Sequence, residues 1–387
     1  MEKLQVVSAE SVAEGHPDKV ADIIADSILD EFLSHDAFAR VACEVLVGKE
    51  AVIVAGEFTS GFKPDFDSIV RQTLRQIGYT SSEIGIAADS CRVIVSASEQ
   101  SEHLRRAMLP SNPKGRRLRL KTDGKSLRAG DQAVVVGFAA DNPFGGIPPE
   151  AYFAKRLAAA LDSRRHSRSI PYLWPDGKTM VSLLVRESVP IKANTIVVSA
   201  QHDPSISLRR LRRDLIEGVV LEAIPATLIA GDTKIVVNPP DGRFSFGGPA
   251  ADTGVTGRKL IADAYGPSVG HGGGALSGKD ATKIDRCGAY LCRHVARTLV
   301  ARGLAEECRI QLSYILGQST PIAVNVTGTL CKGVKKHHHS KVISEMFDLR
   351  PGAAIERLAL RKPLFARATR VRHFGIDPTL PWEIPAK

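Results

Sequence analysis

Long apolar stretches and paired cysteines are both missing from this sequence of 387 residues. Apolar runs such as 133–136 and 196–198 are far shorter than the roughly 20 residues that a membrane-spanning helix needs. The first residues show no charged segment followed by an apolar one, so a secretory signal is not expected. None of the six cysteines forms a Cys-x-x-Cys pair, which argues against a zinc site and favours a reducing cytoplasm.

Acidic residues are fewer than basic ones, and the formal net charge is +10. The basic residues gather in two stretches, 114–128 and 209–213. Such an excess fits nucleic acid, an anionic membrane or a polyphosphate ligand, although each run alone also fits an ordinary solvated surface. Segment 101–129 contains prolines and glycines and little apolar periodicity, so we predict a mobile basic loop that acts as an active-site lid.

The spacing of apolar residues predicts alternating helices and strands. The first predicted helix opens at Pro17, because apolar residues recur at helical spacing over 20–32 and proline is favourable at a first helical position. Strand-like runs follow at 40–47, 51–58 and 91–97, and two more at 309–316 and 322–326 follow a predicted helix over 282–302. A Gly-Asp pair precedes strand-like residues at 130–131 and again at 231–232, which favours repeated domains.

Segment 14–19, Glu-Gly-His-Pro-Asp-Lys, lies where the chain enters the first predicted helix. Free N–H groups and the positive end of the helix dipole attract phosphate at such a position. His16 can donate a hydrogen bond to a phosphate or bridging oxygen, and Asp18 is an oxygen ligand suited to Mg²⁺. The alternative is a plain helix start at which the dipole favours Asp18.

Segment 271–280 nearly matches the phosphate-binding P-loop pattern, G-x-x-x-x-G-K-[ST]. Asp280 stands where the magnesium-binding hydroxyl belongs, and no clear buried strand precedes the glycines, so a standard P-loop is rejected. Glycines still let the backbone approach a polyanion closely, and Lys279 can neutralise its charge. A P-loop-like nucleotide hydrolase is therefore a disfavoured alternative, and a flexible surface loop is another.

A further cluster of aromatic and charged residues lies at 241–259. Phe244 beside Arg243 can stack on an aromatic base, and Asp252 can bind an ammonium group. Arg258 and Lys259 add two cations. The alternative is a glycine-rich turn with a core phenylalanine, and segment 175–178, Pro-Asp-Gly-Lys, is by itself merely a good turn.

A nucleic-acid-binding protein that uses the basic loop is an alternative from a different class. Its weakness is that the basic run lacks interleaved aromatic residues that would stack on bases. His337, His338 and His339 stand beside two lysines, a pattern more typical of a solvated loop than of a metal site.

Taken in order, the motifs resemble those of the methionine adenosyltransferase family over nearly the whole chain. They occupy segments 11–19, 130–132, 175–178, 242–244, 256–259, 272–280, 347–351 and 373–375. The resemblance implies an α+β fold of three similar βαβ-type domains related by a pseudo-threefold axis. We place these domains at 1–100, 130–240 and 241–387, with loop 101–129 between the first two. The resemblance also implies a homodimer or dimer of dimers with active sites between subunits. We further expect a cytoplasmic location and no nucleic-acid or membrane partner.

The implied reaction joins ATP and L-methionine into S-adenosylmethionine and, with water, releases phosphate and diphosphate. Sulfur attacks C5′ of ATP, and the triphosphate is then hydrolysed. A thioether has no proton to lose, so the attack needs no general base. Charge accumulates on the leaving triphosphate, and preorganised cations stabilise such charge most effectively.

The resemblance also implies a role for individual residues. The catalytic set is His16, Lys178, Arg258, Lys279 and Asp131. The ATP-binding set is His16, Asp176, Lys178, Arg243, Phe244, Asp252, Arg258, Lys259, Ala275 and Lys279. The methionine-binding set is Glu57, Gln100, Asp131, Asp252 and Lys283. Two Mg²⁺ ions per site are expected, with Asp18 and Asp285 as ligands, and one K⁺ ion near Glu44.

Several positions depart from the family pattern. Ala133 replaces a glycine, Asn142 and Pro143 replace Glu-Thr, and Met180 replaces a glutamine. These changes lie away from the predicted phosphate-binding residues, so we expect catalysis to be retained. One hypothesis is a divergent copy with a changed preference among methionine analogues.

Overall fold

The computed structural model describes residues 4–99, 127–239, 241–329 and 339–386. Its strands are β1 (Leu4–Val12), β2 (Arg40–Val47), β3 (Ala51–Thr59), β4 (Arg92–Ser98), β5 (Ala133–Ala140), β6 (Leu173–Arg186), β7 (Val189–His202), β8 (Lys234–Val237), β9 (Gly254–Val255), β10 (Glu307–Tyr314) and β11 (Ala323–Thr327). Its helices are α1 (Pro17–His35), α2 (Phe66–Ile77), α4 (Pro149–His166), α5 (Leu208–Leu215), α6 (Leu221–Ala223), α7 (Leu260–Asp263), α8 (Ile284–Ala301), α9 (His339–Met346), α10 (Pro351–Arg357) and α11 (Phe365–Arg370). The predicted helices at Pro17 and over 282–302 are confirmed as α1 and α8.

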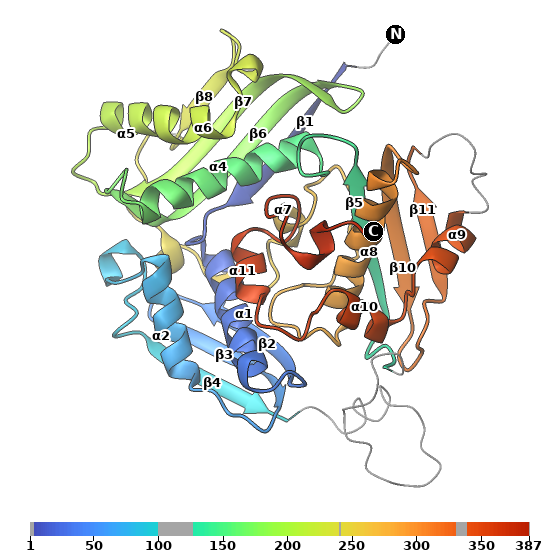
Figure 1. Cartoon of the computed structure of the whole chain (residues 1–387). Helices are drawn as coiled ribbons and strands as arrows, with labels where there is room; N and C mark the ends of the chain where they lie inside the picture. Colours follow the sequence, from blue (N-terminus) through green and yellow to red (C-terminus); the bar gives the residue numbers. More distant parts are fainter. Residues whose placement is uncertain (1–3, 100–126, 240, 330–338, 387) are drawn as a thin grey trace.

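The described strands form three sheets (Figure 1). Sheet I has the order β4-β3-β2-β9, sheet II the order β1-β6-β7-β8, and sheet III the order β11-β10-β5. Each sheet is built on an antiparallel hairpin that follows a long helix: α1 precedes β2–β3, α4 precedes β6–β7, and α8 precedes β10–β11. The long helix packs on the sheet made by its own hairpin. This repetition confirms the α+β class with three similar units.

Strands are exchanged between the three units in a cyclic way. β1 comes just before α1 in the chain but pairs with β6 of sheet II. β5 comes before α4 but pairs with β10 of sheet III, and β9 comes before α8 but pairs with β2 of sheet I. Each unit thus gives its first strand to a neighbour, and this cyclic pattern is consistent with a pseudo-threefold arrangement. The sheets therefore do not follow contiguous stretches of the chain.

The helices α1, α4 and α8 face the middle of the molecule, where α7 and α11 also lie (Figure 1). α1 is buried along most of its length because sheet I covers one side while α11 packs on another. Pro17 occupies the first helical position, as the sequence predicts, and the structure adds that His16 caps the N-terminus.

Contacts of two buried basic side chains cross this central region. Arg286 of α8 makes two hydrogen bonds to Asp26 of α1, at 2.7 and 2.6 Å. Lys155 of α4 is fully buried and donates to backbone carbonyl oxygens of α7 and of segment 372–374. A buried charge without a partner is costly, so these contacts fix how the three units are placed relative to one another.

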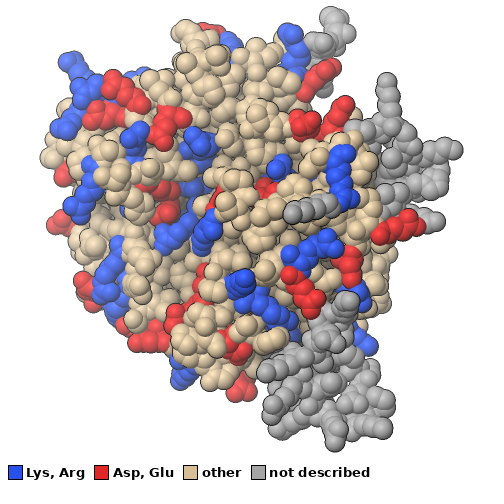
Figure 2. Space-filling model, viewed as in Figure 1, with Lys and Arg blue, Asp and Glu red and all other residues tan. Residues whose placement is uncertain are grey.

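The surface of the molecule mixes charges of both signs. On the face shown in Figure 2, Lys and Arg side chains are interspersed with Asp and Glu over the described residues. Among those residues, each helix is either too short or too polar to cross a membrane. Most of the predicted lid 101–129, together with Gln100, His337 and His338, lies outside the residues that the structure describes.

Candidate active site

A cavity of about 560 Å³ opens between β1, β6 and segment 257–273. Ser8, Glu10 and Met180 line it from sheet II. The facing wall contains Arg258 and Lys259, and residues 271 and 273 of the glycine-rich segment complete it. The cavity therefore brings together three segments that are far apart in the sequence, and it carries cations on one wall.

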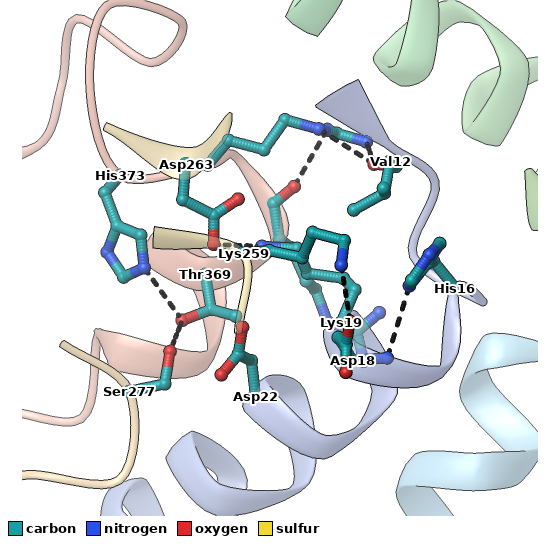
Figure 3. Close-up of polar contacts among 12 residues, drawn as sticks. Val12, His16, Asp18, Lys19, Asp22, Lys259, Asp263, Ser277, Thr369 and His373 are labelled. Carbon is teal, nitrogen blue, oxygen red and sulfur yellow. Dashed lines mark hydrogen bonds and ion pairs between the residues drawn. The ribbon is translucent and has the colours of Figure 1, made fainter. Parts of the chain in front are cut away.

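His16 caps α1 next to this wall (Figure 3). Its Nδ1 accepts the backbone N–H of Asp18 at 3.2 Å, so the ring proton of the neutral form lies on Nε2. Burial and the nearby charge of Lys259 lower the pKa of His16 to about 3. His16 is thus a neutral hydrogen-bond donor at physiological pH, with its free N–H on the side away from the helix backbone.

Asp18 is almost fully buried and holds the 255–259 segment against α1. Its Oδ1 accepts the Val255 N–H at 3.0 Å, and its Oδ2 accepts from Lys259 Nζ at 2.5 Å. Arg258 approaches the same carboxylate to 3.7 Å but remains 55% exposed. Burial raises the pKa of Asp18, but the Lys259 and Val255 hydrogen bonds outweigh burial, and the net pKa is lowered.

Lys178 lies on the outward face of β6, opposite Val12 of β1. Its Nζ is 2.7 Å from Glu10, and both side chains are about half exposed. Lys178 is also close enough to His16 to lower the pKa of that ring. Lys178 thus lies near the group formed by His16, Asp18, Arg258 and Lys259.

A second group lies at the start of α8. Lys279 Nζ is 2.5 Å from Asp285 Oδ2, and Lys279 forms an isolated backbone bridge with Ala42 of β2. Burial raises the pKa of Glu44, which lies two residues further along β2, while the charge of Lys279 opposes that rise. Lys279 therefore lies close to two acidic residues, Asp285 and Glu44.

The two groups meet through the glycine-rich segment. A Cβ on Gly257 would lie 2.5 Å from the Cβ of Ala275, and one on Gly274 would lie 2.2 Å from the carboxylate of Asp285. The absence of side chains at these glycines is what lets the cation-bearing segments approach each other so closely. Ala275 thus sits at the junction of the two groups.

The P-loop alternative is not supported by the backbone. Residues 266–281 contain no strand, and α8 begins only at Ile284, five residues after Lys279. A P-loop requires a strand before the glycines and a helix directly after them.

Segment 241–252 is held by the predicted ATP residue Asp176. Its carboxylate accepts the Gly248 N–H at 2.8 Å, and burial raises the pKa of Asp176 to about 6. Arg243 and Asp252 are exposed, and Phe244 is half-buried against Gly247. The structure thus places these four residues close together, and the carboxylate of Asp176 is bonded to the backbone of Gly248.

The remaining predicted residues are more scattered. Asp131 is exposed two residues before β5, and Gly272 packs on the backbone of Val134 nearby. Glu57 lies on β3 in register with Ala42, the residue that bridges to Lys279. Lys283 occupies the N-cap position of α8, and its side chain makes no capping hydrogen bond there.

Residues that the sequence analysis did not single out lie directly behind the site. Lys19 forms a buried ion pair with Asp263 (Figure 3), and Asp22 accepts the Gly257 N–H at 2.8 Å. Asp26 accepts the Gly278 N–H at the same distance. A signal was present, because Asp22 and Asp26 follow Asp18 at intervals of four residues and therefore share its face of the helix.

The cavity, the neutral histidine and the two lysine–aspartate pairs are the features of an enzyme that binds a polyphosphate. Comparison with known proteins specifies the enzyme further. Models of the S-adenosylmethionine synthetase N-terminal, central and C-terminal domains match residues 5–102, 126–244 and 246–384. The S-adenosylmethionine synthase of Desulforudis audaxviator (strain MP104C) is 45% identical over 377 residues, covering 97% of this chain and 95% of that protein. The chain belongs to the S-adenosylmethionine synthetase family, which is the methionine adenosyltransferase family that the motifs resemble.

Proposed function

We propose that this enzyme forms S-adenosylmethionine from ATP and L-methionine and hydrolyses the triphosphate that leaves. The observation that carries this function is a cluster of cations beside one cavity: Arg258 and Lys259 line the cavity, and the charges of Lys259 and Lys178 act on His16. The family and the near full-length similarity to a synthase of the same reaction support it. They do not favour a P-loop-like hydrolase or a nucleic-acid-binding protein.

The chemistry of the leaving group explains the residue types. Negative charge grows on the bridging oxygen as sulfur attacks C5′, and the free N–H of a neutral His16 is suited to donate to that oxygen. Lys178, Arg258 and Lys259 would surround the phosphate chain from one side and Lys279 from the other. Arg258 and Lys279 would then assist cleavage of the triphosphate.

Two Mg²⁺ ions are proposed to accompany the phosphates, with Asp18 and Asp285 as protein ligands. Mg²⁺ is typically held by one or two carboxylates together with phosphate oxygens, and these two acids stand beside the cations expected to bind the phosphates. When bound, the metal would neutralise charge on the leaving group. K⁺ is proposed to lie near Glu44, which is close enough to Lys279 to feel its charge.

Methionine is proposed to contact Glu57, Gln100, Asp131, Asp252 and Lys283, and adenine to lie near Arg243 and Phe244. The half-buried ring of Phe244 offers an aromatic face beside an exposed guanidinium. Asp176 and Ala275 complete the predicted ATP set. For Asp176, the bond to Gly248 supports a role in holding segment 241–252.

We further propose a cytoplasmic homodimer or dimer of dimers in which two subunits complete each site. Leu46 and Ile94, on the outward face of sheet I, are 38% and 44% exposed, and Glu44 and Glu57 lie on that face too. A second subunit would cover these apolar side chains.

The cysteines support the proposed location. Five described cysteines are buried and unpaired, which fits a reducing compartment.

The decisive experiment mixes purified protein with ATP, methionine, Mg²⁺ and K⁺ and detects the sulfonium product by mass spectrometry. Omission of Mg²⁺ should abolish product formation, and replacement of K⁺ by Na⁺ should slow it. ATP cleavage that does not depend on methionine would instead support a nucleotide hydrolase. Longer S-alkyl homocysteines tested in parallel address the hypothesis of changed substrate preference, and an unshifted preference for methionine would count against it.

A further inference from the structure

Four aspartates recur at every fourth position of α1: Asp18, Asp22, Asp26 and Asp30. We call this set the aspartate ladder. Like charges four residues apart destabilise a helix, and burying carboxylates costs further free energy. Asp22 and Asp26 are 2% and 0% exposed, and burial raises the pKa of Asp22. Such an arrangement persists only where the carboxylates have partners.

Each carboxylate of the ladder accepts backbone N–H groups from a segment far along the chain. Asp18 accepts from Val255 at 3.0 Å, and Asp22 accepts from Gly257 at 2.8 Å. Asp26 accepts from Gly278 at 2.8 Å. Asp30 accepts from the amides of residues 364, 365 and 366 at 3.0, 3.0 and 2.8 Å. The order of the segments along the chain follows the order of the aspartates along the helix.

The first three positions hold the cation-bearing segments of the site. Gly257 immediately precedes Arg258 and Lys259, and Gly278 immediately precedes Lys279. Asp30 instead accepts hydrogen bonds from the amides at the start of α11. This short helix contains none of the predicted site residues. Since four residues of helix span about 6 Å, the ladder sets a fixed separation between the anchor points of the two cation groups.

The two anchored segments have no room to slide. Gly257 has a φ of +82°, and a Cβ there would come within 2.5 Å of Ala275. Gly278 has a φ of +79°, and a Cβ there would lie 1.9 Å from the carbonyl oxygen of Cys43. Both amides that point at the ladder thus belong to glycines in conformations and contacts that other residues would not tolerate.

We propose that Asp22 and Asp26 are positioning residues that hold Arg258, Lys259 and Lys279 at the separation required by a triphosphate chain. They act through the backbone of the cation segments and do not touch the phosphates. This inference rests on the proposed function, in which these cations bind triphosphate. Preorganised cations stabilise developing charge without reorganisation during the reaction, so their spacing decides how well they work.

The test compares Asp22→Ala with Asp30→Ala. Each variant removes a carboxylate that accepts backbone N–H groups, and the two carboxylates lie on the same face of the same helix. The probe is inorganic triphosphate with Mg²⁺, and its Kd is measured by calorimetry. We expect Asp22→Ala to weaken triphosphate binding about tenfold, since small displacements of positioned groups have large effects. Asp30→Ala should leave the affinity unchanged even where its melting temperature falls. Asp22→Asn keeps an acceptor oxygen and should restore most of the affinity.

A second pair covers the case in which Asp22→Ala does not fold. Asp22→Glu and Asp30→Glu keep charge and acceptor but lengthen the side chain by one methylene, so only the former should shift the Arg258–Lys259 segment and weaken binding. Equal losses at positions 22 and 30, or lower melting temperatures with unchanged triphosphate affinity at position 22, would overturn the inference. So would a wild-type protein that does not bind triphosphate. A wild type that binds triphosphate but forms no sulfonium refutes the proposed function instead.

Discussion

His16 combines three local properties that decide its chemistry. It caps α1, its Nδ1 is occupied by the Asp18 N–H, and burial beside Lys259 keeps the ring neutral. A histidine in this state is a hydrogen-bond donor and does not act as a proton carrier near neutral pH. Its place in the mechanism therefore follows from its surroundings as much as from its identity.

Substitution of His16 by alanine should slow sulfonium formation about 100-fold, the order expected on loss of one donor to a developing oxyanion. ATP affinity should change little, because Lys178, Arg258 and Lys259, which we propose to bind the phosphates, are unchanged in this variant. Single-turnover kinetics with mass-spectrometric detection measure the first quantity, and calorimetry with a non-hydrolysable ATP analogue measures the second. Normal turnover by this variant would rule out the assigned role.

Glu14 makes stability depend on pH. Burial raises its pKa, but the hydrogen bond from His166 and the charges of Arg370 and Arg165 outweigh burial and lower the pKa from 4.5 to about 2. A lowered pKa in the folded state stabilises the fold above the unfolded pKa, and this stabilisation is lost as pH falls. The contribution of Glu14 is therefore complete above about pH 4.5 and disappears towards pH 2.

The corresponding variant is Glu14→Gln. Its free energy of unfolding should be lower than that of the wild type at pH 7, and the difference should shrink between pH 4.5 and pH 3. Urea denaturation at these pH values gives the comparison. A difference that stays constant with pH would show that the ionised carboxylate is not the cause.

At the scale of elements, the C-terminal segment is locked to α8 by a buried ion pair. Arg293 donates to both carboxylate oxygens of Glu383, at 2.9 and 2.6 Å, and both side chains are almost fully buried. Glu383 lies in a short 3-10 helix, Pro381–Glu383, and also accepts the Gly375 N–H. Trp382 stacks on Tyr290 in the same contact, with ring centroids 3.6 Å apart. One face of α8 is thereby covered by residues at least 90 positions further along the chain.

Glu383→Gln should destabilise the protein by about 3–5 kcal/mol, because it leaves a buried guanidinium without its counter-charge. Asp377→Asn is a suitable control, since Arg367 in that ion pair is 57% exposed. The control should cost less than about 1 kcal/mol. Chemical denaturation measures both variants, and equal effects would contradict the argument from burial.

At the scale of the molecule, the exchanged strands make the three units dependent on one another. The segment matched by the central-domain model, residues 126–244, lacks β1, which pairs with β6, and carries β5, which belongs to sheet III. Isolated, it would expose an unpaired edge of β6 and a strand without its sheet.

We therefore expect a fragment of residues 126–244 to aggregate or to unfold without cooperativity. A fragment with residues 4–12 joined by a flexible linker should be more stable, because β6 regains its partner. Circular dichroism during thermal unfolding distinguishes the two fragments. A cooperative transition in the fragment that lacks β1 would contradict the importance of strand exchange.

Local pattern was sufficient for many elements and for the type of chemistry. Apolar spacing and Pro17 predicted α1, and the glycine-rich segment with Lys279 and Asp280 argued for polyanion binding without a P-loop. The lack of a strand over residues 266–281 agrees with the rejection of a standard P-loop. These features were accessible because helix caps, turns and glycine requirements depend on neighbouring residues in the chain.

The sequence by itself determined the three-unit α+β architecture, by resemblance, and the kinds of residue that would handle a triphosphate. Only the tertiary structure decided which sheet each strand joins and what holds the cations in place. β1 could have paired with the hairpin of its own unit, and nothing in its residues excludes that pairing. The aspartate ladder had a visible period, but its partners at Gly257, Gly278 and 364–366 are more than 200 residues away, and such contacts are fixed by packing of the whole chain.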